Sequence, residues 1–80
     1  MLEELREGPI VVGLKQLRKA LKDGTVRTVF LARNAESRLV EPIEMLCREQ
    51  KVACVWVETM AELGTACGID VGAAAAATVR

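Results

Sequence analysis

The sequence predicts an α/β domain in which helices cover a four-stranded sheet. Short apolar runs rich in valine alternate with segments whose leucines recur at helical spacing, and glycine or threonine marks the ends of those segments. Eighty residues, 51% hydrophobic and 28% charged, have the composition of one globular domain spanning residues 1–80. A chain of this length buries about 60% of its unfolded surface, enough for one modest core.

The first half of the chain predicts a strand, a helix and a second strand. "PIVVG", which begins at Pro9, is too short for anything but a strand. Gly13 then begins a helix, and Gly24 ends it in the place expected of a C-terminal glycine. "VRTVFLA", residues 26–32, predicts a mostly buried strand, and "RNAES" predicts a loop. One apolar stripe of the helix holds Leu14, Leu17, Ala20 and Leu21.

The second half continues the alternation with two conflicts. Pro42 lies within a helical pattern, so we expect one turn near Ser37 to Glu41 and a main helix that begins at Pro42. "VACVWV" predicts a strand, and "TMAELGTACG" predicts a helix with Thr59 as its cap and Glu62 completing a capping box. Alanine propensity favours a helix for "AAAAATV", but the alternation favours a strand. We predict the strand, or a helical turn leading into a short strand. The apolar side of the Pro42 helix is expected to hold Leu39, Ile43, Leu46 and Cys47.

Several classes of function are disfavoured by composition. Phe30 and Trp56 are the only aromatic residues, which argues against a module that binds single strands by stacking bases on aromatic platforms. No apolar run has the length of a membrane span, and the N-terminal "MLEELREGP" is too acidic for a signal peptide. We therefore expect no membrane partner.

The residues also argue against catalysis, metal binding and a nucleotide cofactor. The chain has no histidine and no C-x-x-C, so Cys47, Cys54 and Cys67 are expected to be small buried thiols in a reducing cytoplasm. There is no nucleophile beside a base, no G-x-G-x-x-G and no P-loop lysine. Glu58 and Glu62, four residues apart, are expected to be surface carboxylates. We predict a protein that is not an enzyme and that uses no cofactor and no metal.

Basic residues gather in one part of a chain that has no formal net charge. Residues 13–38 hold seven basic and two acidic residues, and the rest of the chain holds four basic and nine acidic residues. On the helix that follows Gly13, no acidic residue lies between the cations, and the one acidic residue, Asp23, comes after the last of them. The first-turn amides of that helix favour a phosphate. Its polar side holds Lys15, Gln16, Arg18, Lys19 and Lys22.

A second unusual segment is "LGTACGIDVGAAAAATV". Gly64, Gly68 and Gly72 interrupt it, and Ile69 and Val71 lie in the loop between the last two glycines. These two side chains either point inward and fill the core, or form a small exposed apolar platform for a flipped-out base. The sequence leaves both alternatives open.

Together these segments resemble a known family. "GLKQLRKAL", "FLARNAE" and "VWVETMAELGTACGIDVGAAAAA", with the spacing between them, resemble the superfamily of ribosomal proteins L-seven-Ae and L-thirty-e, and its short bacterial members above all. The resemblance runs from Ile10 to Val79. It implies a three-layer α/β/α sandwich with a central mixed four-stranded sheet. It also implies binding of kink-turn RNA, a sharply bent motif with tandem sheared G·A pairs and a bulged nucleotide.

The resemblance assigns site residues to three segments. Gly13, Lys15, Gln16 and Lys19 stand where the family reads the sheared pairs, although many archaeal relatives have Asn and Glu in place of Lys15 and Gln16. Arg18 and Lys22 are expected to contact phosphates. The extruded nucleotide is expected to pack on the apolar loop, and a neighbouring loop is expected to lie near the RNA. These loops contain Ile69, Asp70 and Val71, and Arg33, Asn34 and Glu36, respectively.

The resulting hypothesis is a cytoplasmic, non-enzymatic protein that binds kink-turn RNA, either ribosomal RNA or a regulatory RNA, as a monomer and without a DNA partner. Regular A-form RNA hides its base edges in a deep, narrow groove, whereas a kink exposes them, so a few cations are enough. The first alternative is a protein-interaction adaptor that uses the same basic helix to bind an acidic partner. A thiol-based redox protein is the second.

Overall fold

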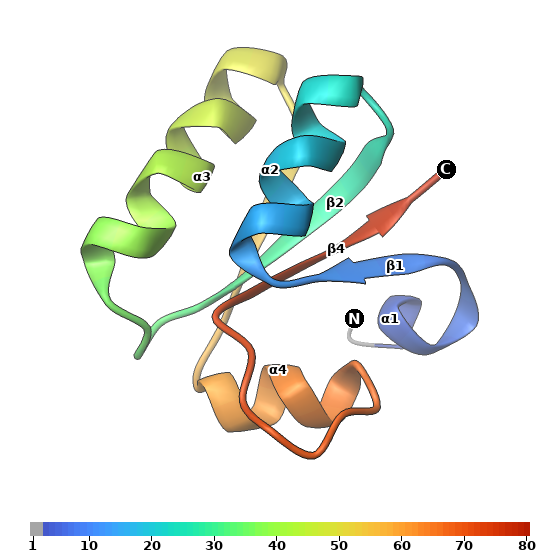
Figure 1. Ribbon diagram of the computed structural model, residues 1–80, viewed down its shortest axis with the longest axis vertical. Coiled ribbons are helices and arrows are strands. Elements are labelled where there is room, and N and C mark those ends of the chain that lie inside the picture. Colours follow the sequence, from blue (N-terminus) through green and yellow to red (C-terminus); the bar gives the residue numbers. More distant parts are fainter. Residues whose placement is uncertain (1–2) are drawn as a thin grey trace.

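A mixed four-stranded sheet with helices on both faces forms the three layers of the protein (Figure 1). The computed structural model describes residues 3–80. The strands lie in the order β1-β4-β2-β3; β2 and β3 run parallel, and β4 runs antiparallel to both β1 and β2. Their bounds are β1 Ile10–Val12, β2 Val26–Ala32, β3 Ala53–Val57 and β4 Ala75–Val79. The predicted fold class and the four strands are confirmed.

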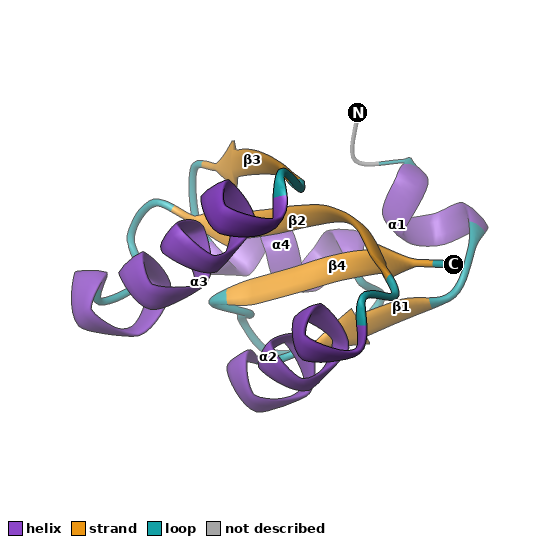
Figure 2. Cartoon of the chain, turned by 90° about the horizontal axis from the view of Figure 1, so that it is seen from above, coloured by secondary structure: helices purple, strands orange, loops and turns teal. Residues whose placement is uncertain are grey.

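The helices divide between the two faces of the sheet. α2 and α3 lie on one face, and α1 and α4 lie on the other (Figures 1 and 2). Their bounds are α1 Glu4–Glu7, α2 Leu14–Asp23, α3 Ser37–Gln50 and α4 Met60–Ala66. None of the helices in residues 3–80 has the length and apolar character needed to cross a membrane.

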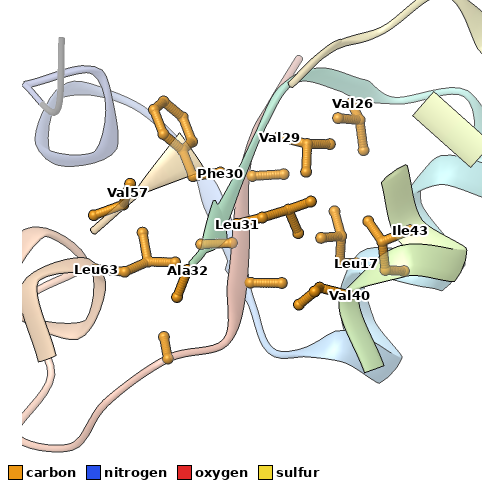
Figure 3. Packing of buried hydrophobic residues seen from close by; sticks show 14 of the residues in the cluster. Leu17, Val26, Val29, Phe30, Leu31, Ala32, Val40, Ile43, Val57 and Leu63 are labelled. Atoms are coloured by element: carbon orange, nitrogen blue, oxygen red, sulfur yellow. The ribbon is translucent and has the colours of Figure 1, made fainter. Parts of the chain in front are cut away.

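β2 contributes side chains to the core on both faces of the sheet. Val29 and Leu31 point toward α2 and α3, whereas Phe30 and Ala32 point toward α4 (Figure 3). All four are completely buried, as expected for a central strand with helices on both sides. The residues around them in Figure 3 are Leu17, Val26, Val40 and Ile43 on the first side and Val57 and Leu63 on the second.

The alanine segment forms the central strand β4. Ala75, Ala76 and Ala77 have no exposed surface, because β4 lies between β1 and β2 with helices packed on both faces. Tertiary packing therefore outweighs the helical propensity of alanine here. The short side chains also let the backbone of α2 lie close to the sheet. This confirms the strand prediction for the segment.

The predicted break at Pro42 is wrong. α3 is one helix from Ser37 to Gln50, and Pro42 lies on its exposed side. The proline removes one helical hydrogen bond, but the carbonyl that loses it belongs to exposed Arg38 and can be solvated. The buried residues Val40, Ile43 and Cys47 recur at helical spacing across the proline, so continuous packing holds the two parts together. Leu39, predicted on the buried side, is 37% exposed instead.

The short helix α1, which the sequence did not predict, is anchored by Leu5, whose side chain is buried in the hydrophobic core.

The predicted start of one helix and end of another are confirmed. Gly24 ends α2 in the left-handed conformation, with φ of 72°, as predicted. Thr59 Oγ1 accepts a 3.0 Å hydrogen bond from the backbone N–H of Glu62, which confirms the predicted cap of α4.

Candidate nucleic-acid interface

Three segments meet at one edge of the sheet, where β1, β2 and β3 end and β4 begins (Figure 1). The N–H of Gly13 donates to the carbonyl oxygen of Ala75 at 3.0 Å, and the N–H of Ala32 donates to that of Ala74 at 2.9 Å. The N–H of Ala73 donates to the carbonyl oxygen of Met60 at 3.0 Å. These bonds place the start of α2, the loop after β2 and the loop before β4 beside one another.

The start of α2 presents backbone amides and cations together. Gly13 precedes the helix with φ of +102°, a conformation that side chains disfavour, and it offers no side-chain cap. The first helical hydrogen bond runs from the N–H of Leu17 to the carbonyl oxygen of Gly13, so the amides of residues 14–16 precede it. Leu17 and Leu21 are buried on the opposite side. The exposed side, which we call the basic face of α2, comprises Lys15, Gln16, Arg18, Lys19 and Lys22.

The loop before β4, residues 67–74, which we call the Val71 loop, presents one large apolar side chain to solvent. Val71 is 70% exposed, whereas Ile69 is half-buried and packs against the core. The sequence left open whether both side chains point inward or both are exposed. Ile69 points inward, and Val71 is exposed. Asp70 between them is exposed.

The position of this loop depends on close backbone packing. A Cβ atom at Gly64 would overlap the carbonyl oxygen of Val71 and lie 3.1 Å from the Cα atom of Gly72. Gly72 packs in turn against Met60, because a Cβ atom there would lie 3.1 Å from the Cβ atom of Met60. The loop therefore lies directly on α4, and this holds Val71 in place.

The loop between β2 and α3 holds three predicted site residues with different surroundings. Asn34 Oδ1 accepts a 2.8 Å hydrogen bond from the N–H of Met60, so its carbonyl oxygen helps to fix the start of α4. Glu36 Oε2 accepts a 2.7 Å hydrogen bond from Nε of Arg38. Arg33 is exposed and lies over the ring of Trp56. All three residues flank the edge at which the other two segments meet.

Trp56 and Glu58 are neighbours of this site that the sequence pattern did not indicate. The Arg33 guanidinium carbon lies 5.8 Å from the centroid of the Trp56 ring, and Arg33 Nε lies 3.4 Å from Glu58 Oε1. The parallel pairing that places Leu31 beside Trp56 brings these side chains together. Parallel strands end at the same edge of a sheet, so this was the available signal in the sequence.

The predicted burial of all three thiols is confirmed for Cys47 and is wrong for Cys54 and Cys67. Cys47 is buried, but Cys54 and Cys67 are only half-buried. A hydrogen bond with Cys54 and burial raise the pKa of the Cys47 thiol, whereas the same hydrogen bond lowers the pKa of Cys54. Burial raises the pKa of Cys67. Within residues 3–80, no three cysteines or carboxylates are grouped in a way that could hold a metal ion.

The fold defines the structural class of the protein. The solved structure titled "Giardia lamblia 15.5kD RNA binding protein" superposes with a TM-score of 0.91 at 23% identity, over 99% of this chain and 70% of that one. The chain is therefore a three-layer α/β/α domain of the same fold.

The sequence identifies the family within that class. Residues 2–80 match the model of the Ribosomal protein L7Ae/L30e/S12e/Gadd45 family, and the chain belongs to this family. An RNA-binding protein of Caldanaerobacter subterraneus is 48% identical over 69 residues, 86% of this chain and 84% of that protein. The RNA-binding protein YbxF of Geobacillus stearothermophilus is 41% identical over 76 residues, 95% of this chain and 93% of that protein. Large ribosomal subunit protein eL8 of Halobacterium salinarum is 38% identical over 80 residues, 98% of this chain and 67% of that protein.

Proposed function

We propose that the protein is a non-enzymatic RNA-binding protein that recognises and stabilises kink-turns. The observation that carries this proposal is the hydrogen bond between Gly13 and Ala75, which joins the start of α2 to the segment that follows the Val71 loop. A cationic helix end and an exposed apolar side chain therefore face the same partner. Family membership and the names of the bacterial relatives support RNA as that partner.

The basic face of α2 supplies the polar part of recognition. Lys15 and Gln16 are exposed in the first turn of the helix and Lys19 in its middle, and the three contact base edges, which a bend in the RNA makes accessible. Arg18 and Lys22 are exposed on the same helix and contact phosphates. The open first-turn amides add a site for a further phosphate oxygen.

The Val71 loop supplies the apolar part. An extruded base has lost its stacking partner, and packing against an exposed aliphatic side chain removes part of its surface from water. Val71 has the exposure that this contact requires, and Asp70 offers an acceptor beside it. Ile69 supports the loop from within, since its side chain packs against the core. Arg33, Asn34 and Glu36 flank the same surface on the side of β2.

A mobility-shift titration tests the proposal directly. A kink-turn duplex is compared with the same duplex lacking its bulge, at one stated salt concentration. Strong preference for the kink-turn supports the proposal. Equal binding to both duplexes contradicts it and favours the adaptor, in which the basic face of α2 binds an acidic protein.

A single substitution locates the contact on α2. Lys19→Ala is expected to weaken binding to the kink-turn by about 1–3 kcal/mol, or about 5- to 150-fold. Arg48→Ala is the matched control, because Arg48 is an exposed cation near the far end of α3. Unchanged affinity of the Lys19 variant would contradict the proposed face.

We further propose that the protein acts in the cytoplasm and as a monomer. One edge of the sheet of a single chain holds all the residues that this proposal assigns to RNA, so a second copy is not needed. Its RNA is either ribosomal RNA, as the name of the archaeal relative suggests, or a separate regulatory RNA. Copurification of the protein with ribosomal subunits at high salt distinguishes the two.

A further inference from the structure

A cluster of three side chains extends the candidate interface toward the edge strand β3. Arg33 follows β2 directly, and its N–H donates a 2.8 Å hydrogen bond to the carbonyl oxygen of Val57 at the end of β3. Its guanidinium lies over Trp56 and beside Glu58. β3 is the outermost strand beside β2 (Figure 2), so no further strand within residues 3–80 covers this side of the cluster.

The cluster is accessible from solvent. The side chain of Arg33 is 58% exposed and that of Glu58 is 76% exposed, while Trp56 is half-buried. The guanidinium lies over the ring of this half-buried indole. Asn34, the next residue after Arg33, is held by its hydrogen bond to Met60, so the backbone beneath the cluster is fixed on both sides.

The contacts restrict Arg33 without using up its hydrogen-bonding capacity. An arginine side chain has many rotamers, and contact with an aromatic face selects a few of them. The Glu58 contact involves Nε, and the guanidinium carries five N–H donors in all. An exposed ion pair contributes only about 0–1 kcal/mol, so a second anion can replace Glu58 at little cost.

We propose that Arg33, positioned by Trp56, binds a phosphate of the RNA backbone and exchanges Glu58 for that phosphate. This inference rests on the proposed function, since it adds a second contact to the same edge of the sheet. Arg33 touches the RNA, and Trp56 acts as a positioning residue. Glu58 competes with the phosphate in the free protein and limits non-specific binding of nucleic acid by this arginine.

RNA fits the cluster better than an acidic protein does. A guanidinium donates two parallel N–H bonds to a carboxylate as well as to a phosphate, so position decides: the cluster lies at the same sheet edge as the basic face of α2, where the proposed function puts RNA. The two sites together span the sheet from the side of β1 to the outer strand β3. A bent RNA brings the backbones of two helical arms close together, which suits two separated cationic contacts.

Three variants test the contact of Arg33 with phosphate, by titration with a kink-turn duplex at several salt concentrations. Arg33→Ala is expected to weaken binding about 5-fold or more and to reduce the slope of log K against log salt by about 1. Arg33→Lys keeps the charge but loses the stacked planar group, so we expect a loss of about 2- to 5-fold. Glu58→Gln removes the competing carboxylate and is expected to strengthen binding about 2-fold.

The positioning role of Trp56 has its own readout. Trp56→Leu is expected to weaken binding as Arg33→Lys does, and to add nothing in a protein that already carries Arg33→Ala. Trp56 is the only tryptophan in the chain, so its fluorescence in the wild-type protein is expected to change on binding. Arg33→Lys leaves the indole intact and tests the geometry even if the leucine variant does not fold.

The results separate this inference from the proposed function. If wild-type protein binds the kink-turn and Lys19→Ala weakens it, but Arg33→Ala and Glu58→Gln leave affinity and salt slope unchanged, this inference alone is overturned. The inference would also be overturned if Trp56→Leu weakened binding in the Arg33→Ala protein as much as in the wild type, since the two residues would then act independently. If wild-type protein shows no preference for the kink-turn, the proposed function itself fails.

Discussion

The backbone N–H of Gly13 donates a 3.0 Å hydrogen bond to the carbonyl oxygen of Ala75. Sixty-two positions separate these residues in the sequence (75 − 13), yet the bond places the first turn of α2 beside the first residue of β4. The bond fixes how far the basic face of α2 lies from the Val71 loop. Any substitution that moves either backbone is therefore expected to change RNA binding as well as stability.

Gly13→Ala tests this junction from the side of α2. Gly13 has φ of +102°, so a side chain there adopts a strained conformation, and its Cβ atom would lie 2.8 Å from Oε1 of Gln16. The Gln16 side chain can move aside, but the backbone strain stays. We expect a loss of about 1–2 kcal/mol in the free energy of unfolding, measured by urea denaturation.

Gly8→Ala is the control for that substitution. Gly8 has an extended backbone with φ of −146°, and a Cβ atom there would meet nothing within 4 Å beyond its chain neighbours, so alanine is accommodated. We expect its stability to stay within about 0.5 kcal/mol of the wild-type value. Equal stability of the two variants would contradict the proposed role of the backbone at Gly13.

Gly64→Ala tests the support of the loop by α4. The added methyl group would overlap the carbonyl oxygen of Val71, so the loop or the helix must shift. We expect a loss of about 1–3 kcal/mol in stability and a loss of kink-turn binding that persists at temperatures where the variant is fully folded. Thr65→Ala, the adjacent exposed position on α4, is the control and is expected to bind as the wild type does.

Local patterns predicted most of the elements, and long-range contacts account for the differences. The leucines of α2 and the cap at Thr59 depend on residues a few positions apart, so spacing was enough to place them. The continuity of α3 across Pro42 depends on the burial of Val40 in the core, a long-range contact that local sequence patterns do not reveal. Likewise, β4 is a strand because β1 and β2 pair with it on both sides.

The candidate site shows the same division. The cations of α2 and the glycines around the Val71 loop were visible in the sequence, because each group lies within one short segment of the chain. The different burial of Ile69 and Val71 was not, since alternation in a loop does not fix which side chain faces the core. The contact of Arg33 with Trp56 depends on the register of two parallel strands, which only the pairing of Leu31 with Trp56 reveals.

Alkylation of the thiols provides a test that does not involve RNA. The pKa of Cys54 is lowered by a hydrogen bond from Cys47, whereas hydrogen bonding and burial raise the pKa of Cys47. The thiolate is the reactive form, so iodoacetamide is expected to modify Cys54 first and Cys47 last, with the Cys54 rate rising as pH passes its lowered pKa. Peptide mass spectrometry measures the order, and faster modification of Cys47 in the folded protein would contradict it.

Val71 and Ile69 offer the sharpest separation of binding from stability. Val71 is 70% exposed, so Val71→Asp is expected to change the free energy of unfolding by less than about 0.5 kcal/mol. The same change places a negative charge against the RNA and removes the apolar contact, so kink-turn binding should fall about 10-fold or more. Ile69→Ala is expected to lower the free energy of unfolding by about 1–2 kcal/mol instead, because Ile69 packs against the core. Both quantities are measured on each variant, by urea denaturation and by titration with the kink-turn duplex. If Val71→Asp binds as tightly as the wild type, the loop does not contact the RNA, and the apolar half of the proposed interface is wrong.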